Sequence, residues 1–254
     1  MQQVTRKTLG AGINLTCVTT PKFKRAVLRA MLVLPLGGED AALRACLPQV
    51  LRRVTARLND MQAFGTALDE LYGARIEAAV RKEGENLCIG FLSDCIDEAY
   101  APGADGLTAG VIGLLCDLLY NPYLQDGLFC AAYVEGERGN LIDRIAALKN
   151  DPRSWAPRRL NELMCENEDY GKSALGTIEQ AERITPETLY AAYRRALSEA
   201  QVELFYCGTM MPDEVEARFM ATPLAQPREG TLYQPHTIVQ VRPVGDVREV
   251  VEDA

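Results

Sequence analysis

The sequence predicts an α+β domain with a largely antiparallel, mixed sheet and helices packed on one face. Three observations favour this fold class: β-rich segments come before any helical pattern, the middle of the chain is helical, and one strand-like segment returns late, at Gln201 to Cys207. Strands and helices therefore do not alternate as they do in a doubly wound parallel fold. With 254 residues, 48% of them hydrophobic, the chain is long enough to build one large core.

The chain opens with two strand segments and a helix. Residues 12–20 are rich in β-branched side chains and alternate in polarity, and residues 23–34 form a longer strand that ends at Pro35. From Glu39 to about Leu58, apolar residues recur at three- and four-residue steps. That spacing predicts a long helix with one face in the core.

A second helix and a hairpin follow. Asp60 has the side chain of a helix cap, and the helix that it starts is expected to end at Gly73. Residues 75–82 and 86–93 are strand-like and are separated by a short turn with a central glycine. This pattern predicts an antiparallel hairpin.

The middle of the chain predicts three helices. Leu107 to Tyr120 is apolar on almost every side but too short to span a bilayer, so we expect a buried helix. Phe129 to Lys149 has an amphipathic pattern. Pro152 favours the start of the next helix, which is expected to end near Cys165.

The last third ends in a segment of different composition. Thr185 precedes a proline and marks the start of a helix, and Pro212 to Met220 has the pattern of a short one. Beyond these, spaced prolines replace any helical pattern. We therefore expect residues 1–221 to form the domain and residues 222–254 to be linker-like, with one possible strand at Thr237 to Val241.

Charge and cysteine usage narrow the functional classes. The 27 basic and 35 acidic residues give a net charge of −8, which argues against nucleic acid or anionic membrane as a partner. No segment has the length of a membrane span, and the N-terminus lacks the apolar core of a secretory signal. The eight cysteines form no C-x-x-C pair, and several lie in apolar runs. We expect reduced thiols and a cytoplasmic location.

The chain has a single histidine, His236, in the linker-like segment. One histidine excludes the zinc motifs that need a histidine pair. Any Ser-His-Asp or Cys-His site would have to use this residue. Its place in the tail predicts an ordinary surface or strand-end side chain.

Five segments of the chain are specific enough to compare with a known family: LPLGGED, LDELYGARIEAAVRKEGENLCIGF, LYNPYL, ERGNLIDRIAALKNDP and YGKSALGTIEQAERITPETLYAAYRRAL. Together they resemble the insulinase/pitrilysin-type metallopeptidases, a family that includes the mitochondrial processing peptidases. The last segment is the most specific, and the likeness covers nearly the whole chain. It is strongest to bacterial, non-catalytic members encoded beside an active relative, and it implies a metallopeptidase-like domain.

Active members of this family carry H-x-x-E-H on the first long helix, where the two His bind zinc and the Glu activates water, and a further Glu completes the site. Aligned on that motif, this chain has Ala45, Pro48 and Gln49 in place of His, Glu and His. The downstream E-x6-E pattern begins at Glu137, but its zinc-binding position is Arg144. The resemblance therefore implies no catalytic residue, no bound metal and no cofactor.

The retained Glu137 has two readings. Arg144 lies two turns away on the same helix face and can form an ion pair with Glu137 that replaces the charge of the metal. Alternatively, Arg144 is an exposed helix residue and Glu137 is an ordinary solvated or ion-paired carboxylate.

The resemblance implies a domain that works by binding. Halves of such proteins form a closed chamber, in which one half carries zinc and the other shapes the cavity, and an extended peptide adds to an exposed strand edge. The matching strand here consists of Arg75, Ile76, Glu77, Ala78, Ala79 and Val80; the alternative is a core strand with a covered edge. The chain resembles one half only. An active zinc-bearing paralogue or a second family domain is the expected partner, and an exposed mating face predicts self-association.

Two other functions stay open. One is a hydrolase with different chemistry, using either a metal on Asp94, Asp97 and Glu98 or a cysteine nucleophile with His236 as its base. The other is a purely structural subunit that supports an active partner and touches no substrate.

Overall fold

The computed structural model describes residues 3–101, 103, 105–225 and 230–235. A six-stranded sheet in the order β1-β2-β8-β3-β5-β4 forms its centre. Only β2 and β8 run parallel, and the other neighbours are antiparallel. The strands are β1 (Gln3–Gly10), β2 (Ile13–Thr19), β3 (Arg25–Pro35), β4 (Arg75–Glu83), β5 (Asn86–Ile96) and β8 (Gln201–Gly208). The predicted α+β class with a largely antiparallel, mixed sheet is confirmed.

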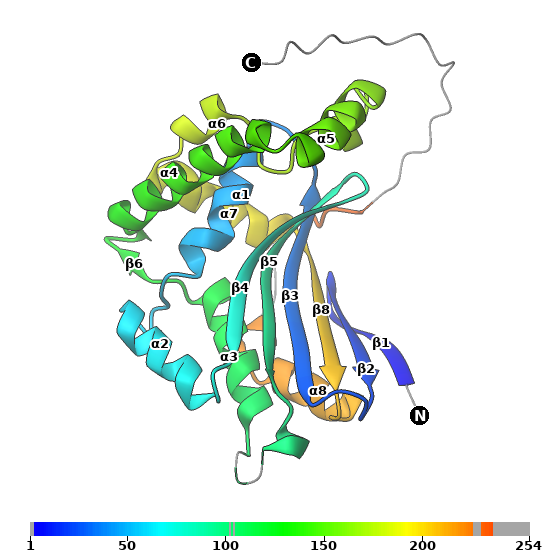
Figure 1. Cartoon of the computed structure of the whole chain (residues 1–254). Coiled ribbons are helices and arrows are strands. Elements are labelled where there is room, and N and C mark those ends of the chain that lie inside the picture. Colours follow the sequence, from blue (N-terminus) through cyan, green and yellow to red (C-terminus); the bar gives the residue numbers. More distant parts are fainter. Residues whose placement is uncertain (1–2, 102, 104, 226–229, 236–254) are drawn as a thin grey trace.

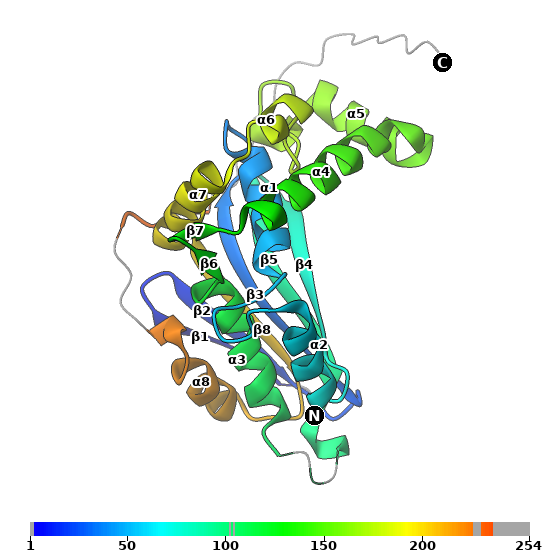
Figure 2. The same cartoon turned by 90° about the vertical axis from the view of Figure 1, so that its left-hand side faces the viewer.

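The helices gather on one face of the sheet and leave the other face open (Figures 1 and 2). Strand β3 shows the reason in its sequence. Alternate residues from Ala26 to Leu34 are apolar and at most 1% exposed, whereas Arg25 and Arg29 point the other way. The helices are α1 (Ala41–Leu51), α2 (Met61–Glu70), α3 (Leu107–Tyr120), α4 (Ala131–Ala147), α5 (Pro152–Met164), α6 (Ile178–Glu182), α7 (Pro186–Glu199) and α8 (Pro212–Met220).

Local signals set most helix boundaries as the sequence predicts. Asp60 accepts a hydrogen bond from the backbone of Ala63 at the start of α2, and Thr185 forms a capping box at the start of α7. Pro152 occupies the first turn of α5. Helix α3 is the buried apolar helix that the sequence predicts. Within the described residues, no helix is both long and apolar enough to cross a bilayer.

The predicted helix from Glu39 to Leu58 is wrong at both ends, because α1 covers only Ala41–Leu51. Pro48 lies inside this helix and lacks the N–H that would bond the preceding turn. Past Leu51 the chain turns away, and the buried Thr55 forms a β-bridge with Pro122. The helical spacing of the apolar residues therefore continues into a loop that packs in the core without helical backbone.

Some elements were not predicted from the sequence. They are β1, the small hairpin of β6 (Leu124–Gln125) and β7 (Leu128–Phe129), and α6. In β1, neither face is fully buried, so its sequence lacks an apolar alternation. The strand predicted at Thr237 to Val241 and the histidine His236 lie outside the described residues.

Candidate functional site

The positions that match the zinc ligands divide between the core and a pocket. Ala45 and Pro48 lie on the buried side of α1, and Ala45 is 0% exposed. An imidazole at position 45 would have to displace core side chains. Gln49, one residue further along α1, is only partly buried and reaches a surface pocket.

This pocket, which we call the pseudo-zinc pocket, has a volume of about 390 Å³. Gln49 from α1 lines it together with Glu137 and Arg144 from α4. The remaining lining residues, Asn140, Leu141 and Asp143, also come from α4. The structure thus brings together the second-His position, the retained Glu and the former zinc-binding Glu position.

Arg53 is the ion-pair partner of Glu137. Its Nε and Nη2 lie 2.6 and 2.5 Å from Glu137 Oε1, and the Asn140 amide donates to Glu137 Oε2 over 3.1 Å. Of the two readings of Glu137, the ion pair with Arg144 is wrong and the alternative is confirmed, because Arg144 is an exposed helix residue and Glu137 is ion-paired elsewhere. Arg53 forms the ion pair because it approaches from the end of α1, whereas two turns of helix separate Arg144 from the carboxylate.

The Arg53–Glu137 pair is partly enclosed. The Glu137 side chain is 10% exposed and that of Arg53 is 30% exposed. The Arg53 guanidinium also lies 5.9 Å from the centre of the Tyr133 ring, one turn before Glu137 on α4. Burial, reinforced by the Glu137 charge, raises the pKa of the neighbouring Cys46 thiol to about 12. The pair supplies a positive charge beside the retained carboxylate without a metal.

The sequence did not identify Arg53. In the helix that we predicted up to Leu58, Arg52 and Arg53 are two adjacent basic residues on a polar face. Only the end of α1 at Leu51 places them where they meet α4 and β4. The one available signal was the Arg-Arg pair directly after the apolar run.

The carboxylates proposed as an alternative metal site serve other purposes. Asp94 forms an ion pair with Arg25 over 2.5 Å. Asp97 is buried and accepts hydrogen bonds from the backbone and hydroxyl of Thr209. Glu98 accepts from the backbone of Thr108 at the start of α3 over 2.6 Å. In the described part of the chain, no three His, Cys, Asp or Glu side chains are grouped to hold a metal.

Most cysteines are buried thiols with raised pKa values. Burial raises the pKa to about 12 for Cys88 and Cys95 and to about 11 for Cys17 and Cys116. A cysteine nucleophile needs a stabilised thiolate, and burial favours the neutral thiol. These four residues are therefore packing residues.

Strand β4 lies at the edge of the sheet, with β5 on one side and no other described strand beyond it. The hydrogen bonds of the neighbouring strand β5 show which backbone groups of β4 point outward. Asp97 and Leu36 donate to the carbonyls of Lys24 and Glu85, which places the backbone groups of the odd residues of β5 toward β3. The even residues of β5 therefore bond the odd residues of β4, given their register.

The outward backbone groups of β4 consequently belong to Ile76, Ala78, Val80 and Lys82. Arg52 confirms the direction, because its Nε donates to the Ile76 carbonyl over 2.6 Å. Of the predicted strand Arg75 to Val80, only the even residues offer hydrogen bonds at the edge. Exposed charged side chains on the odd residues disfavour nonspecific strand pairing at this edge.

The purified chain is expected to hold no stoichiometric zinc. The pseudo-zinc pocket offers two carboxylates, Glu137 and Asp143, and the first is already bonded to Arg53, whereas zinc sites need three or four ligands. Metal analysis by inductively coupled plasma mass spectrometry after dialysis checks this, with the Glu137→Gln variant as a control for adventitious metal. One tightly held zinc per chain, lost in that variant, would contradict the expectation.

Comparison with known proteins gives the family. No family model matches the chain. It is 31% identical over 211 residues to the Bacillus subtilis (strain 168) protein named probable inactive metalloprotease YmfF, an alignment that covers 83% of this chain and 50% of that protein. The chain thus spans about half the length of the curated relative that it matches.

Two solved structures share the fold. A conserved protein from Enterococcus faecalis V583 superposes with a TM-score of 0.81 at 24% identity, over 90% of this chain and 54% of that one. A peptidase M16 inactive domain from Pseudomonas fluorescens gives a TM-score of 0.68 at 14% identity, over 92% and 53% of the two chains. The relative of 31% identity, together with the segments that resemble the insulinase/pitrilysin-type metallopeptidases, shows that the chain belongs to that family, and its positions that match the zinc ligands carry Ala45, Gln49 and Arg144.

Proposed function

We propose that this chain is a non-catalytic half of a peptidase-like chamber, which binds an extended peptide on the edge of β4 and works beside a zinc-bearing paralogue or a second family domain. The observation that carries this proposal is the position of β4: among the described strands it pairs only with β5, so its other edge is unpaired. The pseudo-zinc pocket lies at the end of α1, whose Arg52 contacts this strand. Such a half can hold a peptide in extended form but cannot cleave it.

Peptide binding is supported by the outward backbone groups of β4. Ala78, Val80 and Lys82 present an N–H and a carbonyl each, whereas the Ile76 carbonyl is already bonded to Arg52. An extended peptide can add there as a seventh strand, with main-chain hydrogen bonds supplying affinity. The Arg52 contact closes one end of this edge, so that a peptide would pair from Ala78 onward.

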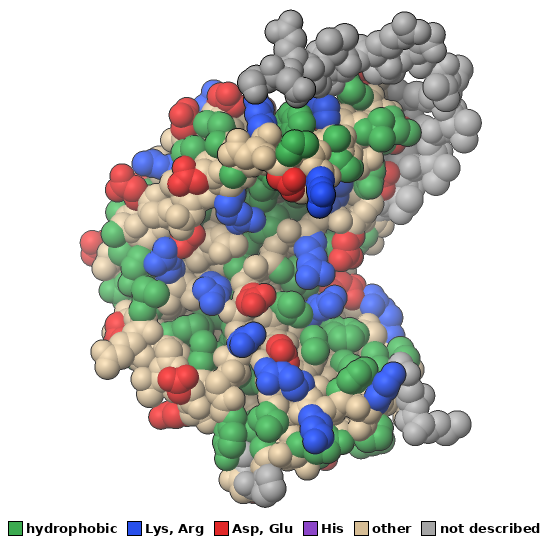
Figure 3. Space-filling model, in the orientation of Figure 1, with side chains coloured by type: hydrophobic (Ala, Val, Ile, Leu, Met, Phe, Trp, Pro, Cys, Tyr) green, Lys and Arg blue, Asp and Glu red, His purple; other side chains and the backbone are tan. Residues whose placement is uncertain are grey.

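Pairing with a second domain is supported by the open face of the sheet (Figure 3). Arg29 lies on this face against the Phe205 ring, and its Nε is buried without a hydrogen-bond partner in the described residues. Met31 and Phe205 line a pocket of about 310 Å³ beside it. A buried donor without a partner costs free energy, which an acceptor from a covering domain would recover.

The test is purification of the tagged full-length protein from its native cell, followed by mass spectrometry of proteins and peptides in the eluate. Ala78→Pro removes one outward N–H without breaking a bond to β5, and Ala78→Thr keeps that N–H. Loss of bound peptide in the proline variant alone, with the partner retained, supports the proposal. A partner without peptide in every sample would favour the purely structural subunit. An eluate that contains neither a partner protein nor a peptide would contradict the proposal.

The chain by itself is expected to self-associate weakly. The exposed side chains of Leu160 (55% exposed) and Met164 (70%) on α5 are apolar surface that a mate would cover, whereas the open sheet face carries both apolar and charged side chains (Figure 3). Sedimentation velocity over a hundredfold concentration range checks this, with Arg29→Glu as a variant that weakens contacts on the sheet face alone. A clean monomer at every concentration would contradict the expectation and weaken the chamber proposal.

The cytoplasmic location stays a proposal. Its support is the cysteine content: all eight residues are free thiols in the structure, and five of them are buried. Buried thiols that form no disulfide are typical of proteins that fold in a reducing compartment.

A further inference from the structure

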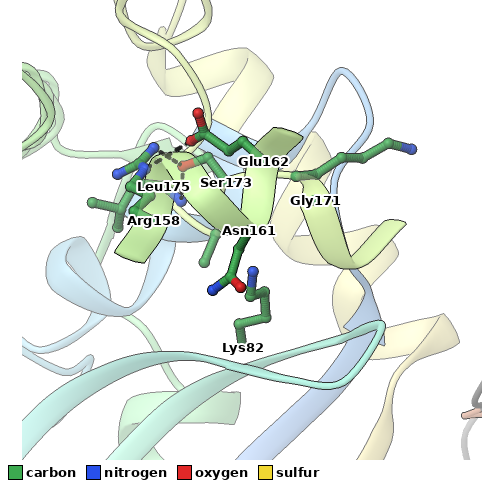
Figure 4. A pocket seen from close by; sticks show the side chains of 9 residues that line it. Lys82, Arg158, Asn161, Glu162, Gly171, Ser173 and Leu175 are labelled. Carbon is green, nitrogen blue, oxygen red and sulfur yellow. Dashed lines mark hydrogen bonds and ion pairs between the residues drawn. The ribbon is translucent and has the colours of Figure 1, made fainter. Parts of the chain in front are cut away.

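A second pocket lies where β4 ends, beneath helix α5 (Figures 3 and 4). Its volume is about 330 Å³, which is enough for one side chain or chain terminus together with water. Lys82 of β4, Arg158 and Asn161 of α5, and Ser173 of the following loop supply its polar lining. We call it the Lys82 pocket.

Lys82 connects this pocket to the edge strand. Its backbone belongs to the outward-facing set of β4, and its side chain turns toward Asn161 (Figure 4). The ammonium donates to the Tyr170 carbonyl over 2.7 Å and lies 4.1 Å from the centre of the Tyr170 ring. These contacts fix the ammonium in place and use only one of its three hydrogen-bond donors. Burial lowers the pKa of Lys82 from its ordinary value, so a nearby anion would stabilise the charged form.

Arg158 is held in place in the same way. Arg158 donates to Glu162 over 2.9 Å and to the Ser173 hydroxyl over 2.8 Å, which leaves further guanidinium N–H groups free. The Asn161 side-chain amide has no hydrogen-bond partner within the described residues, and it faces Lys82 across the pocket (Figure 4). Lys82 and Arg158 are thus fixed donors with hydrogen-bonding capacity left over, which is the feature of a binding site rather than of a filled structural network.

The charge of the lining points to an anion. Lys82 and Arg158 stand against one carboxylate, Glu162, which Arg159 also bonds, and the third cation of the lining, Lys172, is paired with Asp169. This local excess of positive charge occurs in a protein whose net charge is −8. A peptide that lies along β4 past Val80 would meet this group of cations next.

We propose that the Lys82 pocket is a carboxylate-binding subsite, which receives an Asp or Glu side chain or the C-terminal carboxylate of the peptide on β4. This inference rests on the proposed function, since it names the class of peptide that the edge selects. The Lys82 ammonium and the Arg158 guanidinium pair with the carboxylate, and the Asn161 amide donates to it. The selected peptides are therefore acidic at or near the end that lies beneath α5.

The experiment uses the full chain and three fluorescein-labelled heptapeptides of alternating Val and Thr. One ends in Glu with an amidated terminus, one in Gln with an amidated terminus, and one in Gln with a free carboxylate. Fluorescence anisotropy gives each Kd for the unaltered protein and for Lys82→Met, Asn161→Leu and Lys82→Arg, after circular dichroism has shown that each variant is folded.

At least one carboxylate-bearing peptide is expected to bind about tenfold more tightly than the neutral one, the size of one charge-assisted contact. Comparison of the two acidic peptides shows whether the side chain or the terminus is the source. Lys82→Met should remove that advantage, so that the acidic and neutral peptides bind equally, and Lys82→Arg should retain most of it. Equal affinities for all three peptides, or an advantage that survives Lys82→Met, would overturn the inference while leaving the edge-binding proposal intact.

Failure of all three peptides to bind would count against the edge-binding proposal and is separated from the pocket by a second probe. Glutarate alone is titrated at constant ionic strength, and the Asn161 side-chain amide is followed by ¹H–¹⁵N nuclear magnetic resonance. A saturable shift that is absent in Lys82→Met supports a carboxylate site in the pocket. No shift at a large molar excess of glutarate over protein would overturn it, and chloride at the same ionic strength serves as the control.

Discussion

Replacement of Arg53 by Met is expected to lower the free energy of unfolding by about 2–4 kcal/mol. The variant leaves the Glu137 side chain, 10% exposed in the unaltered protein, with only the Asn140 amide as a remaining partner. A buried charge that loses its counter-ion carries its desolvation cost uncompensated. Urea denaturation followed by circular dichroism measures the change.

Two comparisons make the Arg53 result specific. Arg57→Met removes a similar ion pair, with Asp117, but Arg57 is 63% exposed, so the expected loss is below about 1 kcal/mol. The double variant Arg53→Met with Glu137→Leu should recover part of the loss, because it removes the stranded charge. Equal losses for Arg53→Met and Arg57→Met would show that the pair in the pseudo-zinc pocket has no special role in folding.

Gly90→Ala is expected to destabilise the domain by at least about 3 kcal/mol, or to prevent folding. Gly90 lies in β5 between β3 and β4, with φ of 151°, a backbone conformation that favours glycine. A Cβ built there would lie 2.1 Å from the backbone oxygen of Ala30, and backbone cannot move aside as a side chain can. Thermal and urea unfolding of the purified variant give the size of the loss.

Gly113→Ala is the matched control for Gly90→Ala. Gly113 lies inside helix α3, and a Cβ there would meet nothing within 4 Å. The change should stabilise the protein by about 0.5–1 kcal/mol, since alanine favours helix over glycine. A stable Gly90→Ala protein would mean that β3 and β5 can separate locally without cost to the sheet.

The structure explains how a peptidase-like domain can keep its fold without its metal. In an active relative, zinc would join the first long helix to a carboxylate further along the chain. Here the Arg53–Glu137 pair joins the end of α1 to α4, and Ala45 and Pro48 fill the core where ligands would otherwise project. The edge of β4 and the pockets beside it remain accessible, which is what a binding role requires.

The sequence by itself determined the fold class, most element positions and the loss of the zinc ligands. Apolar periodicity located α3, Asp60 and Thr185 marked helix starts by local hydrogen bonds, and the ligand positions were decided by residue identity alone. Each of these signals acts within a few residues of the chain. They were therefore readable without knowledge of long-range contacts.

Only the tertiary structure decided which charges meet and which strand forms the edge. Arg53 and Glu137 are 84 residues apart, and their pairing depends on where α1 ends and how α4 crosses it. Helical spacing continues past Leu51, so periodicity misplaced that end, and the partner considered for Glu137 was Arg144 on its own helix face. The Lys82 pocket likewise joins β4 to a loop 88 residues later, at Tyr170. Contacts of this range are set by the packing of whole elements, which no local pattern encodes.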